Sequence, residues 1–214
     1  PAGVAIGGDL DVNNELDLSD GELSLGTGTF SILGTIIRTN GSVTAGGGST
    51  VAIGGIGSQL VIPANSFTAG NVNNFTINRA SGVVLSSNLL VSGVLGLQAA
   101  NPSAITGSLE TNSHVLVMGA LATTIGPGDV NGTVVRTSFL PDVPYSFGNQ
   151  YTTVTFNSAG TLPSEMGIRI ALGVAPSWKQ DAILRSYDVI RTGGSGSGLT
   201  VNLHYLASEL NANE

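Results

Sequence analysis

The sequence predicts an all-β protein: a parallel β-solenoid of about six rungs followed by an antiparallel β-sandwich. Three observations predict this fold. Short apolar pairs recur at a near-constant spacing, glycine is abundant at 31 of 214 residues, and the regular spacing stops near Asn131. Glycine-rich turns between many short strands are typical of all-β architectures. We therefore expect a solenoid over residues 1–130 and a sandwich over residues 131–214.

The repeat consists of apolar-x-apolar pairs whose successive steps are 20, 21, 24, 20 and 20 residues. This alternation is typical of a strand with one buried face. A fixed period near 20 residues predicts rungs that bury their apolar faces only by stacking. We expect the paired side chains to form inward-facing ladders on parallel strands. The pairs are Leu10/Val12, Phe30/Ile32, Val51/Ile53, Phe75/Ile77, Leu95/Leu97 and Val115/Val117.

Two further strands are expected in most rungs, because other apolar positions recur between the pairs. At roughly 4.8 Å per rung, six rungs give a rod on the order of 25–30 Å long. The second strand is expected at Leu16/Leu18, Ile36, Leu60/Ile62 and Val83/Leu85, and the third at Leu23/Leu25, Val43, Leu89/Val91 and Leu109.

The C-terminal part has longer strands and most of the aromatic residues. Strands of this length with turns between them favour an antiparallel sandwich. The glycine-rich segment Gly193–Gly198 lies between the last two strands, so we interpret it as a hairpin loop. The expected strands are Val134–Arg136, Thr152–Phe156, Ile168–Val174, Ile183–Ile190 and Leu199–Leu206.

Composition excludes several classes of function. The net charge of −7 argues against nucleic-acid binding. The chain has no cysteine, so disulfides, thiolate metal sites and cysteine nucleophiles are excluded. It also has no run of 18 apolar residues, so no membrane span is expected. Only 10% of residues are charged, and small polar residues dominate, which favours an extracellular or cell-surface protein.

Glycine, arginine and aromatic residues follow a spaced pattern in the C-terminal part. The matching positions are Gly132, Val134 and Arg136; Phe147 and Gly148; Tyr151, Val154 and Thr155; Arg185, Tyr187 and Val189; and Leu203 and Tyr205.

This pattern resembles β-sandwich modules of large secreted cell-surface proteins of Bacteroidetes/Chlorobi-type bacteria, where such modules commonly follow β-repeats like residues 1–130. The resemblance implies a secreted or surface-exposed architectural role without catalytic activity. In such proteins strand sequence continues after the segment that matches Ser208–Asn211, so the resemblance implies either that something else completes the sandwich or that the chain continues beyond Glu214.

The densest charge in the chain is an acidic cluster near its start. Carboxylates two residues apart on a strand share a face, and oxygen ligands suit Ca²⁺, so Asp9, Asp11, Asp17 and Asp20 are the candidate calcium ligands. The alternative is that the cluster forms the polar outer surface of the first rungs. Its members are Asp9, Asp11, Glu15, Asp17, Asp20 and Glu22. No other cofactor is expected.

Catalysis is not expected. A polysaccharide-active β-helix enzyme needs paired carboxylates, or a base with a bound metal. In rungs two to six the only acid before Asp129 is Glu110, and the only bases are Arg38 and Arg79. His114 and His204 lie 90 residues apart, so a histidine site requires the two parts of the chain to converge. Such an enzyme is the least supported alternative.

Aromatic and basic residues in the C-terminal part offer a second kind of surface. Arg136, Arg169, Arg185 and Arg191 either form a binding patch with Trp178 and Tyr187 or cover aromatic side chains inside the fold. Trp178 lies in a loop-like stretch and is an interface residue if exposed and a core residue if buried.

The leading hypothesis is an extracellular structural protein that assembles head-to-tail into a fibre by β-strand addition. Solenoid ends expose unpaired strand edges, which recruit other chains unless they are capped. We expect the segment Ala2–Val12 of one copy to pair near Leu199–Leu206 of the next. The alternative is an adhesin, with the solenoid as stalk and the sandwich binding a glycan or another surface ligand. The expected assembly residues are Val4, Ile6, Leu10, Val12, Leu199, Val201, Leu203 and Tyr205.

Overall fold

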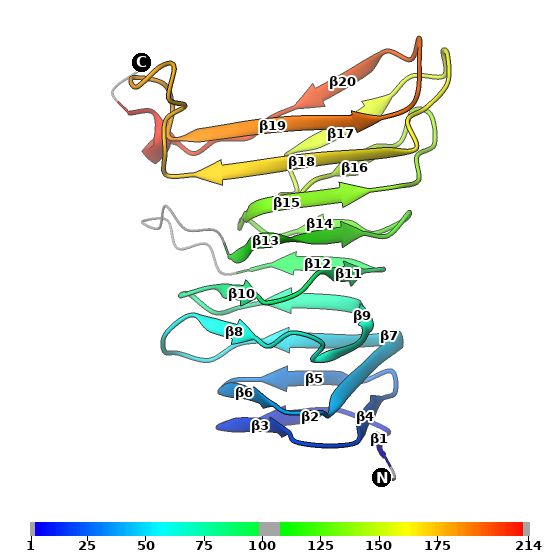
Figure 1. Cartoon of the computed structure of the whole chain (residues 1–214), viewed down its shortest axis with the longest axis vertical. Coiled ribbons are helices and arrows are strands. Elements are labelled where there is room, and N and C mark those ends of the chain that lie inside the picture. The colour runs from blue at the N-terminus through cyan, green and yellow to red at the C-terminus, as the bar shows by residue number, and fades with distance from the viewer. Residues whose placement is uncertain (1–2, 99–107, 212–214) are drawn as a thin grey trace.

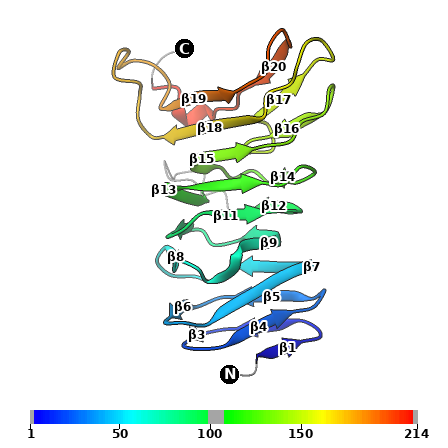
Figure 2. The same cartoon turned by 45° about the vertical axis from the view of Figure 1, so that its right-hand side comes forward.

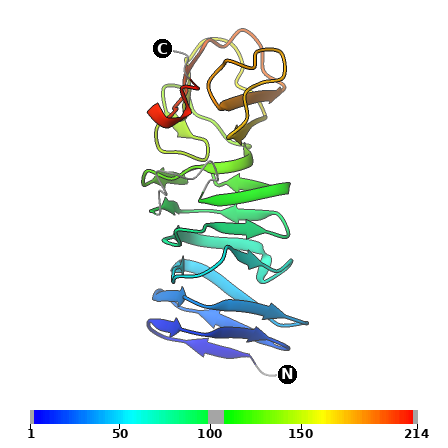
Figure 3. The same cartoon turned by 90° about the vertical axis from the view of Figure 1, so that its left-hand side faces the viewer.

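The protein is an all-β rod in which parallel rungs stack along the long axis (Figure 1). The computed structural model describes residues 3–98 and 108–211. Strands make up 54% of the structure and helix 2%. The N-terminus lies at one end of the rod and the C-terminal strands at the other, as the side view also shows (Figure 3). The predicted parallel solenoid of about six turns is confirmed.

Each rung contributes strands to three ladders, which we call face 1, face 2 and face 3. Face 1 runs β2–β5–β7–β9–β12–β14, and every pair in it is parallel. The face 1 strands are β2 (Leu10–Val12), β5 (Thr29–Ile32), β7 (Ser42–Ile53), β9 (Phe67–Ile77), β12 (Val94–Leu97) and β14 (Thr123–Ile125).

Face 2 consists of the pair β3–β6 and the ladder β8–β10–β13, and face 3 runs β1–β4–β7–β9–β11–β13–β15. The long strands β7, β9 and β13 turn a corner and so serve two faces. In β7 the corner falls at Gly47 and Gly48, whose φ angles of +62° and +93° favour glycine. The remaining solenoid strands are β1 (Val4–Ile6), β3 (Glu15–Leu18), β4 (Glu22–Leu25), β6 (Thr35–Arg38), β8 (Leu60–Ile62), β10 (Val83–Leu85), β11 (Leu89–Val91), β13 (Leu109–Met118) and β15 (Val130–Arg136).

The first five predicted apolar pairs stack on face 1. The ladder places Leu10 on Phe30, Phe30 on Val51, Val51 on Phe75 and Phe75 on Leu95, and the second members of the pairs stack likewise. Between Phe30 and Leu97 these side chains are at most 1% exposed. They form the centre of the hydrophobic core.

The sixth predicted pair is wrong by one residue. In β13 the buried side chains are Leu116 and Met118, while Val115 and Val117 are only half-buried. This part of β13 also pairs with β11 on face 3, and the face 1 partner of Leu95 is Thr124. The fifth rung is longer than the others, so a constant count of 20 residues lands on a different face. An offset of one residue turns every strand side chain to the other side.

The C-terminal strands continue the rod as two sheets. One sheet extends face 3, because β18 pairs antiparallel with β15 and β19 pairs antiparallel with β18. The other is a separate antiparallel sheet in the order β16–β17–β20. One hydrophobic cluster extends from Leu16 to Leu172, and the expected boundary at residues 130/131 falls inside β15. A separate sandwich domain over residues 131–214 stays a prediction. The strands are β16 (Pro144–Ser146), β17 (Thr153–Phe156), β18 (Glu165–Leu172), β19 (Arg185–Thr192) and β20 (Leu199–Asn202).

Two expectations for the last strands are wrong. Gly193–Gly198 does not close a hairpin, because β19 belongs to the face 3 sheet and β20 to the three-stranded sheet, which Figure 2 shows as separate ribbons. The final strand also stops at Asn202, before Leu203 and Tyr205. Here the Tyr187 hydroxyl donates a hydrogen bond to the carbonyl oxygen of His204. The chain then forms the single-turn 3₁₀ helix η1 (Ala207–Glu209).

Candidate assembly interface at the two ends of the rod

The N-terminal end of the rod consists of strands with one ladder partner each. Within the described residues, β1 pairs only with β4 and β2 pairs only with β5. The apolar columns end here uncovered: Leu10 and Val12 are half-buried, whereas Phe30 and Ile32 above them are 1% and 0% exposed. Val4 is 59% exposed.

The N-terminal segment is therefore a docked strand rather than a free tail. Val4, Ala5 and Ile6 pair with Leu23, Ser24 and Leu25 of the same chain. Ala2, the first residue of the predicted assembly segment, lies outside the described residues. The free edge of β1, and not a detached strand, is what this end offers to a partner.

The C-terminal end likewise combines a strand that has one ladder partner with apolar columns that end at the surface. Strand β20 pairs only with β17 in the part of the chain that the structure describes. Leu199 pairs with the fully buried Phe156 and Val201 with the fully buried Val154, yet Leu199 and Val201 are 42% and 37% exposed. Their apolar columns thus end without a cover.

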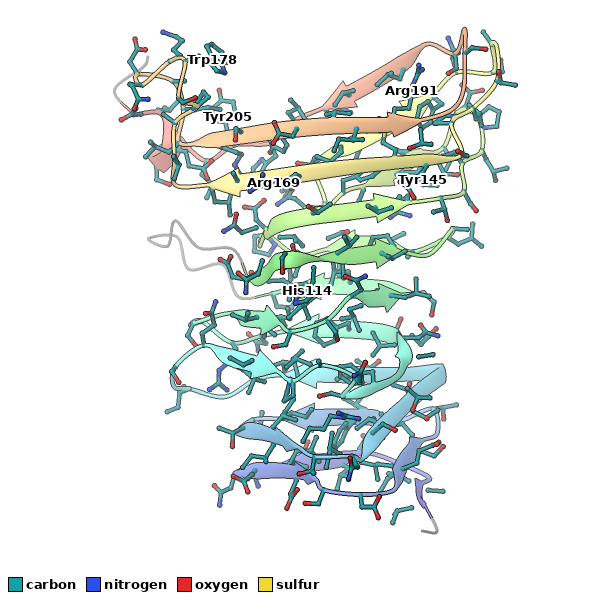
Figure 4. The ribbon with its side chains drawn as sticks, viewed as in Figure 1. His114, Tyr145, Arg169, Trp178, Arg191 and Tyr205 are labelled. Carbon is teal, nitrogen blue, oxygen red and sulfur yellow. The ribbon has the colours of Figure 1, made fainter. Side chains whose placement is uncertain are left out.

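All eight predicted assembly residues lie at the ends of the rod, four at each end. Leu203 and Tyr205 follow β20 and are about half exposed. Figure 4 shows Tyr205 and Arg191 at the C-terminal end. The sequence did not identify β19 as an open edge, although its last residues Asp188–Thr192 are all exposed.

A buried ionic cluster anchors the C-terminal end. Arg185 donates to both carboxylate oxygens of Asp129 at 2.8 Å and to those of Glu209 at 2.9 and 2.8 Å. The Arg185 side chain is 0% exposed. Burial lowers the pKa of Arg185, but hydrogen bonds to the two carboxylates outweigh it and raise the pKa above its ordinary value. The cluster ties η1 and β19 to the last rung.

The arginine side chains do not form one binding patch. Arg136 is 1% exposed and donates to the carbonyl oxygens of Gly119, Ala122 and Ser146. Its guanidinium lies 5.4 Å from the centre of the Tyr145 ring. Burial lowers the pKa of Arg136 to about 10.

Two of the four candidates are thus interior, as the alternative interpretation expected. Arg169 and Arg191 are exposed on β18 and β19.

Trp178 is exposed, which settles the question left open by the sequence. Its side chain is 82% exposed in the loop between β18 and β19 (Figure 4). A shallow pocket of about 530 Å³ lies beside it, lined in part by Pro176, Tyr187 and Asp188. Such a loop tryptophan is an interface candidate.

The acidic cluster does not gather into a metal site. No group of three or more His, Asp or Glu side chains able to hold a metal ion occurs in residues 3–98 and 108–211. Asp9 accepts a hydrogen bond from the backbone N–H of Thr29 at 2.7 Å, and Asp17 accepts one from the hydroxyl of Ser19. All six carboxylates are exposed, which is the arrangement expected of a polar outer surface. The described residues therefore contain no cluster of carboxylates that supports the calcium hypothesis.

The two histidines lie in different parts of the fold. His114 lies on β13, whereas His204 follows β20 and packs its ring against Tyr151 with 5.0 Å between ring centres. Glu110 accepts a hydrogen bond from the side-chain amide of Asn131 at 2.8 Å. The structure does not bring the two histidines into one site.

Comparisons of the chain with protein-family models, with curated proteins and with solved structures give no significant match. None of the helical segments in the described residues has the length and hydropathy to traverse a bilayer.

Proposed function

We propose that this protein is an extracellular structural subunit that assembles head-to-tail into a fibre by β-strand addition. One observation carries the proposal: both ends of the rod combine an open strand edge with an apolar column that is buried inside the molecule and half exposed at its end. Unpaired edges of this kind recruit another chain. A contact between two different ends repeats without closing, which produces a filament.

Such a contact buries apolar side chains and pairs backbone groups at the joint. Val4 is 59% exposed and Ile6 is half-buried, so covering the rest of both side chains contributes roughly 1–3 kcal/mol, before the cost of association is subtracted. Backbone hydrogen bonds across the joint add to this. In this proposal the two C-terminal sheets form the predicted sandwich, and the neighbouring copy completes it.

Charge favours contact between unlike ends. The first 37 residues carry six carboxylates and no Lys or Arg, and all six carboxylates are exposed. Two N-terminal ends facing each other repel, because like charges at short range raise the energy of a complex. The C-terminal end carries Arg191 and Lys179 beside its own acids, so it accepts an acidic partner with less repulsion.

Composition supports the extracellular location. The chain has one Lys and no Cys, and only 10% of its residues are charged. The same scarcity of acids and bases supports a role without catalysis. A polysaccharide-degradation assay with turnover that disappears on substitution of Asp17 or Glu110 contradicts this part of the proposal.

The test is electron microscopy of the native protein and of two N-terminal variants, a deletion of residues 1–8 and a double change of Val4 and Ile6 to Asp. We expect fibres from the native chain and isolated rods from both variants. Ile37→Asp is the matched control, because Ile37 is 49% exposed on the side of the second rung. A native protein that stays monomeric at high concentration refutes the fibre.

The second candidate function is an adhesin, in which the solenoid is a stalk and the C-terminal part binds a glycan. The 82% exposed Trp178 beside a pocket favours it, because aromatic faces pack on the apolar faces of sugars. If the protein is an adhesin, Trp178→Ala is expected to abolish binding of the protein to a glycan array and to leave its thermal stability unchanged. Retention that does not depend on Trp178 excludes this site.

A further inference from the structure

The sheet of face 3 begins and ends with a strand that has one ladder partner among the described residues. Its strand order is β1–β4–β7–β9–β11–β13–β15–β18–β19, so β1 and β19 are its outermost strands. The pairs from β1 to β15 are parallel. Since β18 is antiparallel to β15 and β19 is antiparallel to β18, β19 runs in the same direction as β1.

The side-chain columns of this sheet connect the two edges. Ladder pairs relate Ala45 to Val72, Val72 to Val91 and Val91 to Met118, and Ile6 pairs with Leu25 in the rungs below. Ser24 pairs with Thr44, so Leu25 lies beside Ala45, and Ile6 and Met118 belong to one column. The column of Val4 runs through Leu23 and Val43 to Phe67, because the register between β7 and β9 shifts after Val43.

The column of Ile6 and Met118 reaches β19 at Arg191: Val117 pairs with Val135, so Met118 lies beside Arg136, and Arg136 pairs with Met166 and Met166 with Arg191. The neighbouring column of Leu116 also reaches β19. Leu116 pairs with Val134, Val134 with Ile168 and Ile168 with Val189. Leu116, Val134 and Ile168 are all 0% exposed, whereas Val189 is 47% exposed and Val4, at the other end, is 59% exposed. The column of Val189 is thus buried inside the rod and uncovered at the C-terminal end, and the column of Val4 is likewise buried at Val43 and Phe67 and uncovered at the N-terminal end.

Only part of β19 is free to accept a strand. Its first half is occupied, because Arg185 binds Glu209 and Tyr187 donates to the carbonyl oxygen of His204. The exposed half, Asp188–Thr192, accommodates the three residues of β1.

We propose that β1 of one copy pairs in parallel with β19 of the next, with Val4 on Val189, Ala5 on Ile190 and Ile6 on Arg191. This inference rests on the proposed fibre and fixes its acceptor strand, direction and register. The sheet of face 3 then continues unbroken from one subunit into the next, and Ile6 covers the methylene groups of Arg191.

This joint differs from the pairing near Leu199–Leu206 that the sequence suggested. The sheet that contains β20 stands over face 1, since the backbone N–H of Thr124 donates to the Ser146 hydroxyl on β16 at 3.0 Å. The first strand of face 1 is β2. In a head-to-tail stack β20 of one copy therefore faces β2 of the next, and β19 is the strand that lies opposite β1.

Disulfide trapping tests the joint cleanly, because the chain has no cysteine. Ala5→Cys and Ile190→Cys change exposed positions that the proposal places opposite each other, and they lie at opposite ends of one rod, so a bond between them joins two molecules. The two single variants are mixed under assembly conditions and oxidised. Ala5→Cys mixed with Asp188→Cys tests a register shift, and Ala5→Cys mixed with Thr200→Cys tests the rival strand β20.

We expect about ten-fold more linked dimer from the Ala5/Ile190 mixture than from either control, because a disulfide forms only when the Cα atoms are roughly 4.4–6.8 Å apart. Fibres that link equally well through Asp188 or Thr200 overturn the inference and leave the fibre function intact. Monomers in every mixture, with no fibres from the native chain, overturn both. Val189→Asp, at the exposed edge, is an independent check: normal fibres from this variant exclude β19 as the acceptor.

Discussion

At the scale of single residues, Arg185 is the charge on which the C-terminal end depends. Burying a charged group costs several kcal/mol unless partners satisfy it. Four hydrogen bonds of 2.8–2.9 Å to Asp129 and Glu209 do so here. The same contacts position β19, the strand that we assign as the acceptor of the next subunit.

Replacing Arg185 with leucine is expected to destabilise the protein by about 3–5 kcal/mol, because Asp129 and Glu209 are left buried without a cation. Urea unfolding followed by circular dichroism measures the change. Arg169→Leu is the control, since Arg169 is exposed on the neighbouring strand, and its effect is expected within about 0.5 kcal/mol. Equal effects of the two changes refute the role assigned to the buried cluster.

At the scale of elements, the period of the sequence predicts the face 1 ladder because rungs of equal length repeat their inward positions. Leu10, Phe30, Val51, Phe75 and Leu95 stack as the spacing predicts. The prediction fails at β13, where a longer rung changes both the face and the phase. A constant period does not predict which residues point inward after a rung of a different length.

Alanine substitutions in β13 distinguish the two registers. Leu116→Ala is expected to cost about 2–5 kcal/mol, because Leu116 is fully buried in the column to Val134. Val117→Ala removes a smaller, half-buried side chain and is expected to cost less than half as much. Chemical denaturation of both variants gives the comparison, and a larger loss from Val117→Ala contradicts the observed register.

The pairing of the C-terminal strands could not be predicted from local patterns. The strands themselves are recognisable, but Gly193–Gly198 has the composition of a hairpin loop and instead passes between two sheets. The partners of Arg185 lie 56 and 24 residues away in the chain, with no periodic signal that relates them. Leu10 and Val12 could be placed at one end of the rod because they belong to the first rung of the period.

At the scale of the whole molecule, the rod has a direction, because its two ends differ. Successive rungs run in one direction, one end carries six exposed carboxylates, and the other carries β19 and β20 with exposed apolar side chains. Unlike ends are the basis of head-to-tail growth, because each added copy presents the same free end as the one before it.

The stacking of rungs also determines how the molecule responds to tension. A rung of about 20 residues occupies only about 4.8 Å of the rod axis, but the same residues span roughly 66–72 Å when fully extended. Pulling on the ends of the chain is therefore expected to release rungs one after another, in length steps of roughly 60 Å. Single-molecule force spectroscopy measures these steps, and one abrupt rupture of the whole rod contradicts the expectation. A single chain pulled in this way lengthens to many times its folded length before any covalent bond is strained.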